Sequence, residues 1–246
     1  ASTEEAQENV AISVAEGVVA YLATGTVKNA VNLPSLSTED LERVSPYMDL
    51  TERLGRFLGQ LAEGGPKSLE VTYCGPLDSP MELLSASALK GLLSEFISGA
   101  HINLVNGPVL AKERGIEIIA TTRSEMPVYT NLIELKLITD AGERSVAGAF
   151  VHEGEPRIVR IDQFSVDTVP EGYMLVFTND DQPGMIGAIG TLLGEHKINI
   201  AGMQLGRTRK NDKAVAILAV DNLIPDEVME KVRALPSINT ANLVCL

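Results

Sequence analysis

The chain has 246 residues, of which 45% are hydrophobic, and this apolar content is enough for one large core or for two domains of ordinary size. Its formal net charge of −13 and its 4% aromatic content argue against nucleic acid as a partner, and the charge also argues against an anionic membrane. No apolar run approaches the roughly 18 residues that a membrane helix needs. The two cysteines, Cys74 and Cys245, have no metal-ligand spacing, so we expect a reduced cytosolic compartment, no disulfide and no metal.

The first region predicts a single long helix and a linker. Ser2 and Thr3 followed by two glutamates are typical of a helix start, and valines then recur at helical spacing until Gly25. Residues 27–36 have mixed character and predict a linker. We expect residues 1–34 to be the last helix and linker of a domain whose remainder is missing, in a chain processed or cut from something longer.

The middle region, 35–171, predicts one domain with a mixed sheet covered by helices. It opens with a helical region from Thr38 to about Glu63, which we expect to break near Pro46. Strand and helix patterns then alternate. The predicted strands are 69–73, 102–105, 116–121, 131–139, 146–152 and a short pair within 157–164, and the predicted helices are 80–98 and 108–114.

The last region, 172–246, predicts a second, smaller domain. Its elements are a strand (173–179), a helix (183–196), two strands (198–208 and 214–220), a helix (226–235) and a strand (238–245). This βαββαβ order is the ferredoxin-like pattern. The chain as a whole is therefore predicted to be α/β, more narrowly α+β.

The turn before the first helix of this second domain is the strongest candidate for a binding site. A helix start is suited to a small anion such as a carboxylate, and Asp181, just before Pro183, can accept an ammonium group. The two together suit a free amino acid. Asp181 could equally be an ordinary acidic cap, and Asn179 and Asn199, which carry both donor and acceptor atoms, could simply form turns.

Gly184, Gly187 and Gly190 recur every three residues along the same helix. Glycines lower helix stability, so we expect them to allow a close approach, either of the domain's own sheet or of a helix in a second copy. Their spacing does not match a dinucleotide-binding loop, and the sequence has no phosphate-binding loop. We therefore expect no cofactor-binding residue.

Other chemically active residues form no recognisable catalytic set. His101, His152 and His196 have no ligand spacing. Arg157 and Arg160 could together recognise a phosphate or carboxylate, or they could be solvated strand residues. We expect no catalytic residue and no metal site.

Four segments carry a resemblance to a known family. GYMLVFTNDDQPGMIGAIGTLLGEHKINIAGMQLGR resembles an ACT domain, the amino-acid-binding module of metabolic enzymes, and in particular the one that ends long-form D-3-phosphoglycerate dehydrogenases. HINLVNGPVLAKERGIEI is similar to the intervening, allosteric substrate-binding domain of that family. ASTEEAQENVAISVAEGV and TVKNAVNLP are similar to the exit from its catalytic half.

The resemblance implies the regulatory half of an NAD-dependent dehydrogenase of L-serine biosynthesis, whose nucleotide-binding loop and catalytic residues lie upstream of residue 1. It implies a homo-oligomer formed through the ACT domain, in the cytoplasm or, if a transit peptide lies upstream, in an organelle. The alternative is a free-standing amino-acid sensor or a regulatory subunit of an iron–sulfur L-serine dehydratase.

The resemblance also implies an effector site for L-serine. Family contacts fall on Asn179, Asp181 and Asn199, the last supplied by the neighbouring chain. The helix start at Pro183, Gly184 and Met185 completes the candidate site. Asn179 departs from the commoner family residues, and Asp180 adds a negative charge that disfavours a carboxylate nearby.

Overall fold

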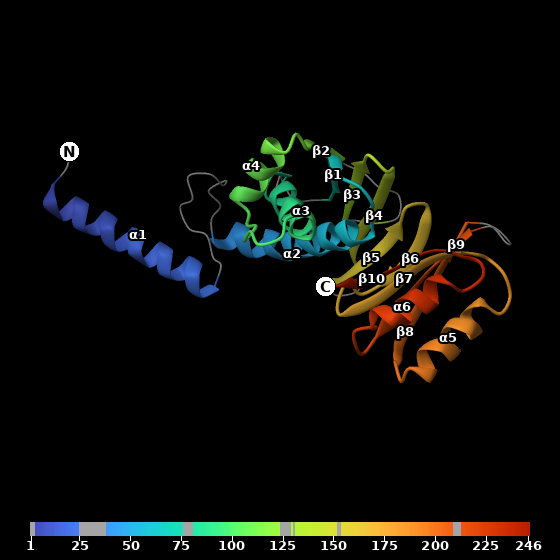
Figure 1. Cartoon of the computed structure of the whole chain (residues 1–246). Coiled ribbons are helices and arrows are strands. Elements are labelled where there is room, and N and C mark those ends of the chain that lie inside the picture. The colour runs from blue at the N-terminus through green and yellow to red at the C-terminus, as the bar shows by residue number, and fades with distance from the viewer. Residues whose placement is uncertain are drawn as a thin grey trace. The chain divides into compact units, whose positions relative to one another are not determined.

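The computed structural model describes residues 3–24, 38–75, 81–123, 129, 131–151, 154–208 and 213–246. The predicted linker at 27–36 lies outside the described residues. The chain divides into two compact units, residues 1–43 and 44–246, and each is described by itself (Figure 1). None of the helices in the described ranges is long and apolar enough to cross a membrane.

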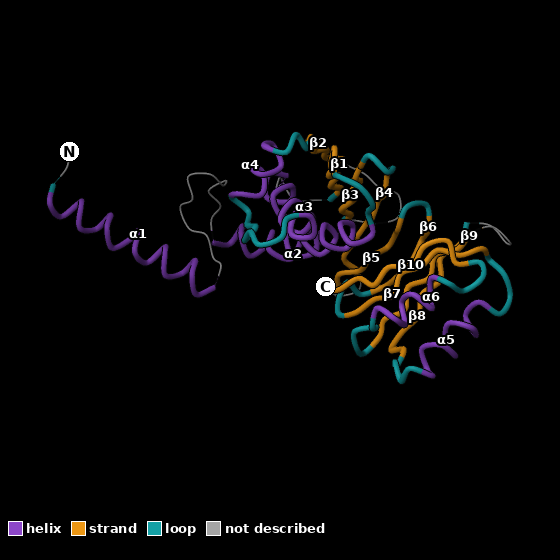
Figure 2. Tube along the Cα trace, viewed as in Figure 1, coloured by secondary structure: helices purple, strands orange, loops and turns teal. Residues whose placement is uncertain are grey.

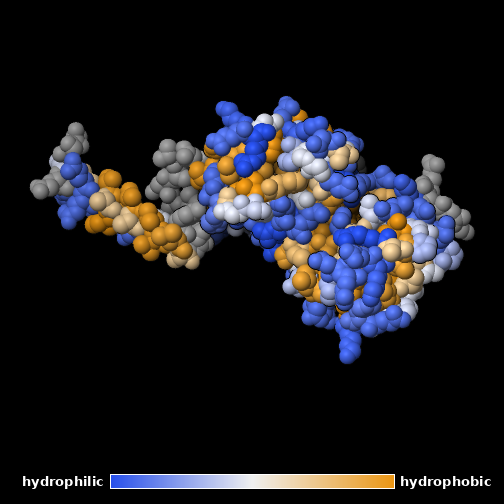
Figure 3. Space-filling view, in the orientation of Figure 1, coloured by the Kyte–Doolittle hydropathy of each residue, from blue (hydrophilic) through white to orange (hydrophobic). Residues whose placement is uncertain are grey.

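The first unit contains helix α1 (Glu4–Thr24), as predicted. Its large apolar side chains are between 51% and 78% exposed, and Figure 3 shows the hydrophobic surface they form along the helix. An apolar stripe of this kind is stable in water only when another surface covers it. The prediction that α1 belongs to a larger domain remains a prediction.

Helix α2 (Thr38–Leu61) opens the next domain and runs without interruption, so the predicted break near Pro46 is wrong. Proline removes one helical hydrogen bond, at a cost of about 3 kcal/mol in a helix interior. Tertiary packing offsets this cost, because Leu50, Leu54, Phe57 and Leu58 of the same helix are fully buried.

The domain is built on a six-stranded mixed sheet with strand order β2-β1-β3-β4-β5-β6, which confirms the predicted mixed sheet. β1 and β2 are parallel and the other neighbours are antiparallel. Figure 2 shows the strands and helices along the trace. The elements after α2 are β1 (Pro66–Cys74), α3 (Met81–Phe96), α4 (Asn106–Glu113), β2 (Glu117–Arg123), β3 (Leu132–Thr139), β4 (Glu143–Val151), β5 (Glu155–Ile161) and β6 (Phe164–Thr168).

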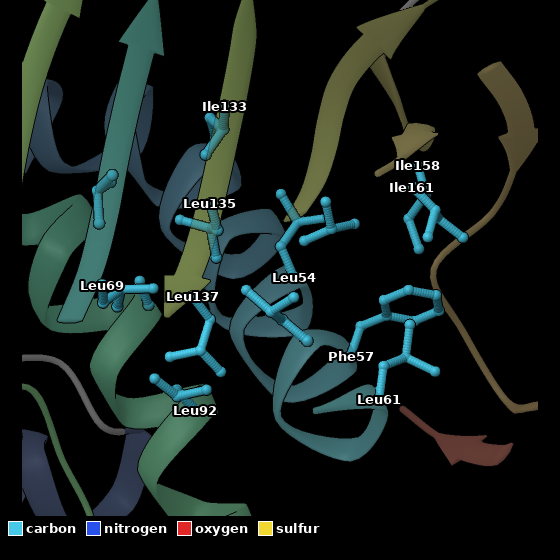
Figure 4. Close-up of a cluster of buried hydrophobic side chains, with 14 of the residues drawn as sticks. Leu54, Phe57, Leu61, Leu69, Leu92, Ile133, Leu135, Leu137, Ile158 and Ile161 are labelled. Carbon is cyan, nitrogen blue, oxygen red and sulfur yellow. The ribbon is translucent and has the colours of Figure 1, made fainter. Parts of the chain in front are cut away.

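One face of this sheet packs against α2 and α3 and forms the main core. Figure 4 shows Leu54 and Phe57 of α2 among strands that carry Leu135 and Ile158, and all four side chains are fully buried. The other face of β1 carries the partly exposed Glu70 and Thr72 and, at the end of the strand, Cys74 of a small buried cluster. The helices of the main core pack against the opposite side, and we call this one the open face of the sheet.

The predicted strand at 102–105 is wrong, because this segment is a turn that leads into α4. The side chain of Asn103 accepts hydrogen bonds from the backbone N–H groups of Val105 and Asn106, both at 2.9 Å. The side chain of Asn106 in turn accepts one from the N–H of Asn103 at 2.7 Å. These local bonds replace strand pairing, as asparagine side chains often do, and α4 begins at Asn106 rather than Pro108.

The last domain has the predicted βαββαβ order, folded as a four-stranded antiparallel sheet with strand order β10-β7-β9-β8. This domain has its own hydrophobic core, in which Leu175 and Phe177 of β7 pack against residues of α5 and α6. The first helix begins at Met185, so Pro183 lies before the helix rather than in its first turn. The elements are β7 (Tyr173–Asp180), α5 (Met185–Glu195), β8 (Ile200–Arg207), β9 (Lys213–Val220), α6 (Asp226–Arg233) and β10 (Ile238–Cys245).

Candidate effector site

The end of β7 carries a buried, incompletely bonded asparagine. Side chains alternate along a strand, and Leu175 and Phe177 face the helices, so Asn179 lies on the same face at the end of the strand. Asn179 is only 5% exposed. Its Nδ2 donates to the carbonyl of Asp180 at 2.8 Å, but its Oδ1 has no hydrogen-bond partner. A buried acceptor without a partner is unfavourable by about 1–3 kcal/mol, so a ligand that donates a hydrogen bond to this atom would be stabilised.

The start of α5 lies a few residues after Asn179. Its N-cap is Gly184, which has a left-handed φ of 97° and provides no side-chain capping hydrogen bond. Met185 is 9% exposed and anchors the first turn in the core, whereas Pro183 is exposed. The first N–H groups of a helix have no partner within the helix, and Gly184 has no side chain to bond them, so α5 presents backbone donors at its start.

Asp181 pairs with Arg207 beside the start of α5. The Nη1 of Arg207 lies 3.4 Å from a carboxylate oxygen of Asp181, and the Arg207 side chain is 62% exposed. β7 and β8 both run antiparallel to β9, and Asn179 and Arg207 both pair with Ala214 of β9. The two strands therefore end at the same end of the sheet.

Arg207 is a candidate site residue that the sequence analysis missed. The predicted βαββαβ order contains the signal that finds it. In that order the first and second strands run in the same direction, so their carboxyl ends, at 179 and 208, lie at the same end of the sheet on either side of the third strand. The site therefore has a cationic group as well as a carboxylate, a carboxamide and a helix start.

Asn199 lies at the other end of the sheet. Its Nδ2 donates to the carboxylate of Asp221 at 2.7 Å, and its carbonyl accepts from the N–H of Asp221 at 3.2 Å. The neighbouring Ile200 pairs with Val220, six residues along β9 from Ala214, which corresponds to about 20 Å. Within one chain, Asn199 cannot meet Asn179, so it could reach this site only from a second copy.

The glycines of α5 do not pack against the domain's own sheet, so that interpretation is wrong. A Cβ atom added at Gly184, Gly187 or Gly190 would meet nothing within 4 Å among the described residues. The buried residues of α5 are Met185, Ile189 and Leu193, on the opposite face of the helix. The glycine face is therefore open.

The structure does not bring Arg157 and Arg160 into one anion site. Arg157 pairs with Glu155 at 2.7 Å and with Asp167 at 3.7 Å, and Arg160 pairs with Glu134. Arg157 lines a pocket of about 510 Å³ that is also lined by β8, whereas Arg160 lines a different pocket, of about 620 Å³, on the open face of the six-stranded sheet. Each guanidinium is already neutralised by a carboxylate.

The histidines and cysteines are dispersed. His101 is exposed, His196 bonds through its ring to the carbonyl of Leu192 and to Lys231, and His152 lies outside the described residues. Both cysteines are free thiols. Burial raises the pKa of the Cys245 thiol, and the nearby Glu95 carboxylate raises it further, so this thiol is less readily ionised than an exposed one.

Comparison with known families identifies both domains. Residues 43–162 match the family model of the D-3-phosphoglycerate dehydrogenase intervening domain, and residues 173–237 match the ACT domain. The chain is thus an intervening domain of the D-3-phosphoglycerate dehydrogenase family followed by an ACT domain.

Its relatives are D-3-phosphoglycerate dehydrogenases, and the chain corresponds to their C-terminal part. It is 39% identical to the enzyme of Synechocystis over 248 residues, which cover all of this chain and 45% of the relative. It is 36% identical to that of Methanocaldococcus jannaschii and 32% identical to that of Bacillus subtilis, covering all of this chain and 47% of each relative. The chain therefore spans about half the length of these relatives.

Proposed function

We propose that this chain is the regulatory and oligomerisation portion of an NAD-dependent D-3-phosphoglycerate dehydrogenase of L-serine biosynthesis. We further propose that its ACT domain binds L-serine or a similar small amino acid. The observation that carries the ligand proposal is the buried Oδ1 of Asn179, which lacks a partner close to the start of α5.

The proposed ligand matches the groups at this site. Its carboxylate accepts hydrogen bonds from the first N–H groups of α5, where the helix dipole favours an anion. Its ammonium group donates to Oδ1 of Asn179 and to the carboxylate of Asp181, in competition with Arg207. The carboxylate of Asp180 already has a partner, because it accepts a hydrogen bond from Nδ2 of Asn239 at 3.2 Å. Asn199 of a second copy completes the site.

Titration calorimetry with L-serine tests this proposal. We expect Asn179→Ala and Asp181→Ala each to weaken binding by about ten- to a hundredfold, or about 1.4–2.8 kcal/mol, and Asn199→Ala to weaken it too. Thr178→Ala is the matched control, because Thr178 neighbours Asn179 but bonds to Thr240 on the opposite face of the strand, at 2.6 Å. Arg157→Ala is a second control. Unchanged affinity in Asn179→Ala and Asp181→Ala would exclude this site.

We propose that the ACT domain also forms the homo-oligomer. The open glycine face of α5 would allow close helix contact, and the neighbouring edge strand β8 exposes Met203 and Leu205 at 43% and 52%. We expect light scattering at tens of micromolar to give at least twice the chain mass of 26.3 kDa. Gly187→Leu should lower that mass by blocking the contact, and a chain that is already monomeric would contradict the proposal.

NAD binding and catalysis are assigned to the remainder of the dehydrogenase. We expect this chain alone to reduce no NAD with 3-phosphoglycerate and to bind none, because it has no glycine-rich phosphate loop. Saturable NAD binding measured by calorimetry would contradict this assignment. An intact mass and the upstream coding sequence distinguish the dehydrogenase from a free-standing sensor or a dehydratase subunit, and from an organellar form with a transit peptide.

A further inference from the structure

Strand β2 (Glu117–Arg123) is an open edge of the six-stranded sheet. Among the residues that the structure describes, β1 is the only strand that pairs with it. The parallel pairing with β1 keeps one register over all seven residues, with no bulge. Six of the seven residues are exposed, and Ile119 is 40% exposed. The outer edge of β2 therefore presents a regular row of backbone groups.

The other sheet edges in the described part of the chain are covered or irregular. β6 packs against β8 so closely that a Cβ at Gly206 would lie 2.6 Å from the carbonyl oxygen of Ser165. The end of β10 is held by Gln60 of α2, whose side chain bonds to both backbone groups of Cys245, at 2.8 and 3.0 Å. β8 itself has a register shift near Gly202.

Strand β2 has none of the usual features that prevent edge pairing. Proteins protect exposed edges with proline, inward-pointing charges, lysine or bulges. The sequence of β2, EIIATTR, has none of these within the strand and is rich in β-branched residues, which favour strands. Its two charges lie at its two ends and have opposite signs.

We propose that β2 pairs with β2 of a second copy in antiparallel orientation, about a two-fold axis at Ala120. In the register that pairs all seven residues, Glu117 of each copy lies opposite Arg123 of the other. Ile118 lies opposite Thr122, Ile119 opposite Thr121, and Ala120 opposite itself. Opposite charges at facing positions stabilise antiparallel pairs, so the strand is complementary to itself in this register.

The faces of the sheet are also matched in this arrangement. Glu117, Ile119 and Arg123 are exposed, and their register with Ser68, Glu70 and Cys74 of β1 places them on the same face of the sheet as Glu70. Ala120 is in register with Val71 and lies on the helix-covered face. A two-fold axis perpendicular to the sheet joins open face to open face and gives one continuous twelve-stranded sheet. This contact uses no ACT-domain residue and is independent of the proposed effector site and ACT contact.

A position-specific disulfide tests the register. In a Cys245→Ser background, where the remaining Cys74 is buried, we expect Ala120→Cys to form a covalent dimer on mild oxidation. Facing residues in an antiparallel pair have Cα atoms about 4.5–5.5 Å apart, within the range of a disulfide. Thr122→Cys is the matched control and should not cross-link, because it faces Ile118. No dimer with Ala120→Cys, or equal cross-linking by Thr122→Cys, would overturn the proposal.

A charge exchange provides a test without a covalent bond. Sedimentation equilibrium at low salt should show that Glu117→Arg and Arg123→Glu each weaken association by about five- to thirtyfold, because each places like charges opposite each other twice in the two-fold interface. The double variant restores both pairs and should associate within about twofold of the unaltered chain. Single variants without effect, or a double variant as weak as the singles, would overturn the proposal. Loss of the ACT contact through Gly187→Leu would leave this pattern intact.

Discussion

Glycines line helices in both domains, but they have different physical roles in each. In the intervening domain, α2 and α3 carry Gly55 and Gly91 where the two helices cross. In the ACT domain, α5 carries Gly187 and Gly190 on a face that no described residue covers. A glycine in a helix therefore indicates a role only when its surroundings are known.

The crossing of α2 and α3 requires the absence of a side chain. A Cβ at Gly91 would lie 2.8 Å from the backbone nitrogen of Arg56 and far inside van der Waals contact with the carbonyl of Glu52, and a Cβ at Gly55 would clash with the carbonyl of Ala88. Backbone atoms of a packed helix cannot move aside without disturbing the core. These glycines allow two helices to meet at backbone distance inside one chain.

The glycine face of α5 gives no such benefit inside one chain. Its glycines lower helix stability relative to alanine by about 0.5–1 kcal/mol each, and no residue in the described part of the chain approaches them closely enough to offset this. Such an uncompensated local loss is typical of a functional surface. A contact made only in the assembled protein would account for it.

Gly91→Ala should give the largest change in stability. The added methyl group forces α2 and α3 apart, and overpacking of this kind destabilises by about 1–3 kcal/mol. For a chain of this size, we expect the melting temperature to fall by about 2–12 °C. Thermal unfolding monitored by circular dichroism measures this change in melting temperature. Gly107→Ala is a suitable control, because its nearest contact would be an ordinary 3.6 Å; an equal loss in both variants would show that the close crossing is not the cause.

Gly187→Ala should have a smaller effect, and one of opposite sign. In dilute solution the alanine should stabilise α5 by about 0.5–1 kcal/mol, since it improves helix propensity and meets nothing among the described residues. At high concentration the methyl group should hinder the proposed contact between copies. Melting temperature measured over a range of concentrations separates the two effects. A loss of stability at every concentration would mean that Gly187 is in close contact with another part of the same chain.

Sequence periodicity predicted the order of elements well in the ACT domain and less well where local bonds or packing override it. The βαββαβ order follows from strong alternation and from helices with clear apolar stripes. The segment 102–105 looks like a strand from hydrophobicity, but Asn103 and Asn106 bond to its backbone. Pro46 looks like a break, but the core beyond it holds the helix together.

The candidate site could be located from sequence only in part. The turn at Asn179 and Asp181 stands out because a strand, an acidic pair and a Pro–Gly step adjoin there. Burial of the Asn179 carboxamide depends on packing against distant residues, which no local pattern reveals. Arg207 is brought to the site by strand register, 26 residues along the chain from Asp181.

The smallest expected effect concerns the charges around the α2–α3 crossing. Burial raises the pKa of Glu95 above its ordinary value, and this outweighs the favourable effects of Arg56, Ser94 and Gln60. The charged form of Glu95 is therefore disfavoured in the folded chain. Its contribution to stability is fully present below the ordinary value of 4.5 and is lost as the pH rises through the higher folded-state pKa.

Glu95→Gln removes this charge while keeping its shape. We expect the variant to be slightly more stable than the unaltered chain at pH 7, by well under about 1 kcal/mol because the side chain is partly exposed, and the difference should vanish below pH 4. Glu52→Gln is the contrasting variant, since Glu52 pairs with Lys90 at 2.8 Å and its loss should destabilise at pH 7. Denaturant titrations at both pH values measure the free energies of unfolding. If Glu95→Gln were less stable at pH 7, the ion pair with Arg56 would outweigh burial, and the crossing would depend on its charges as well as on its glycines.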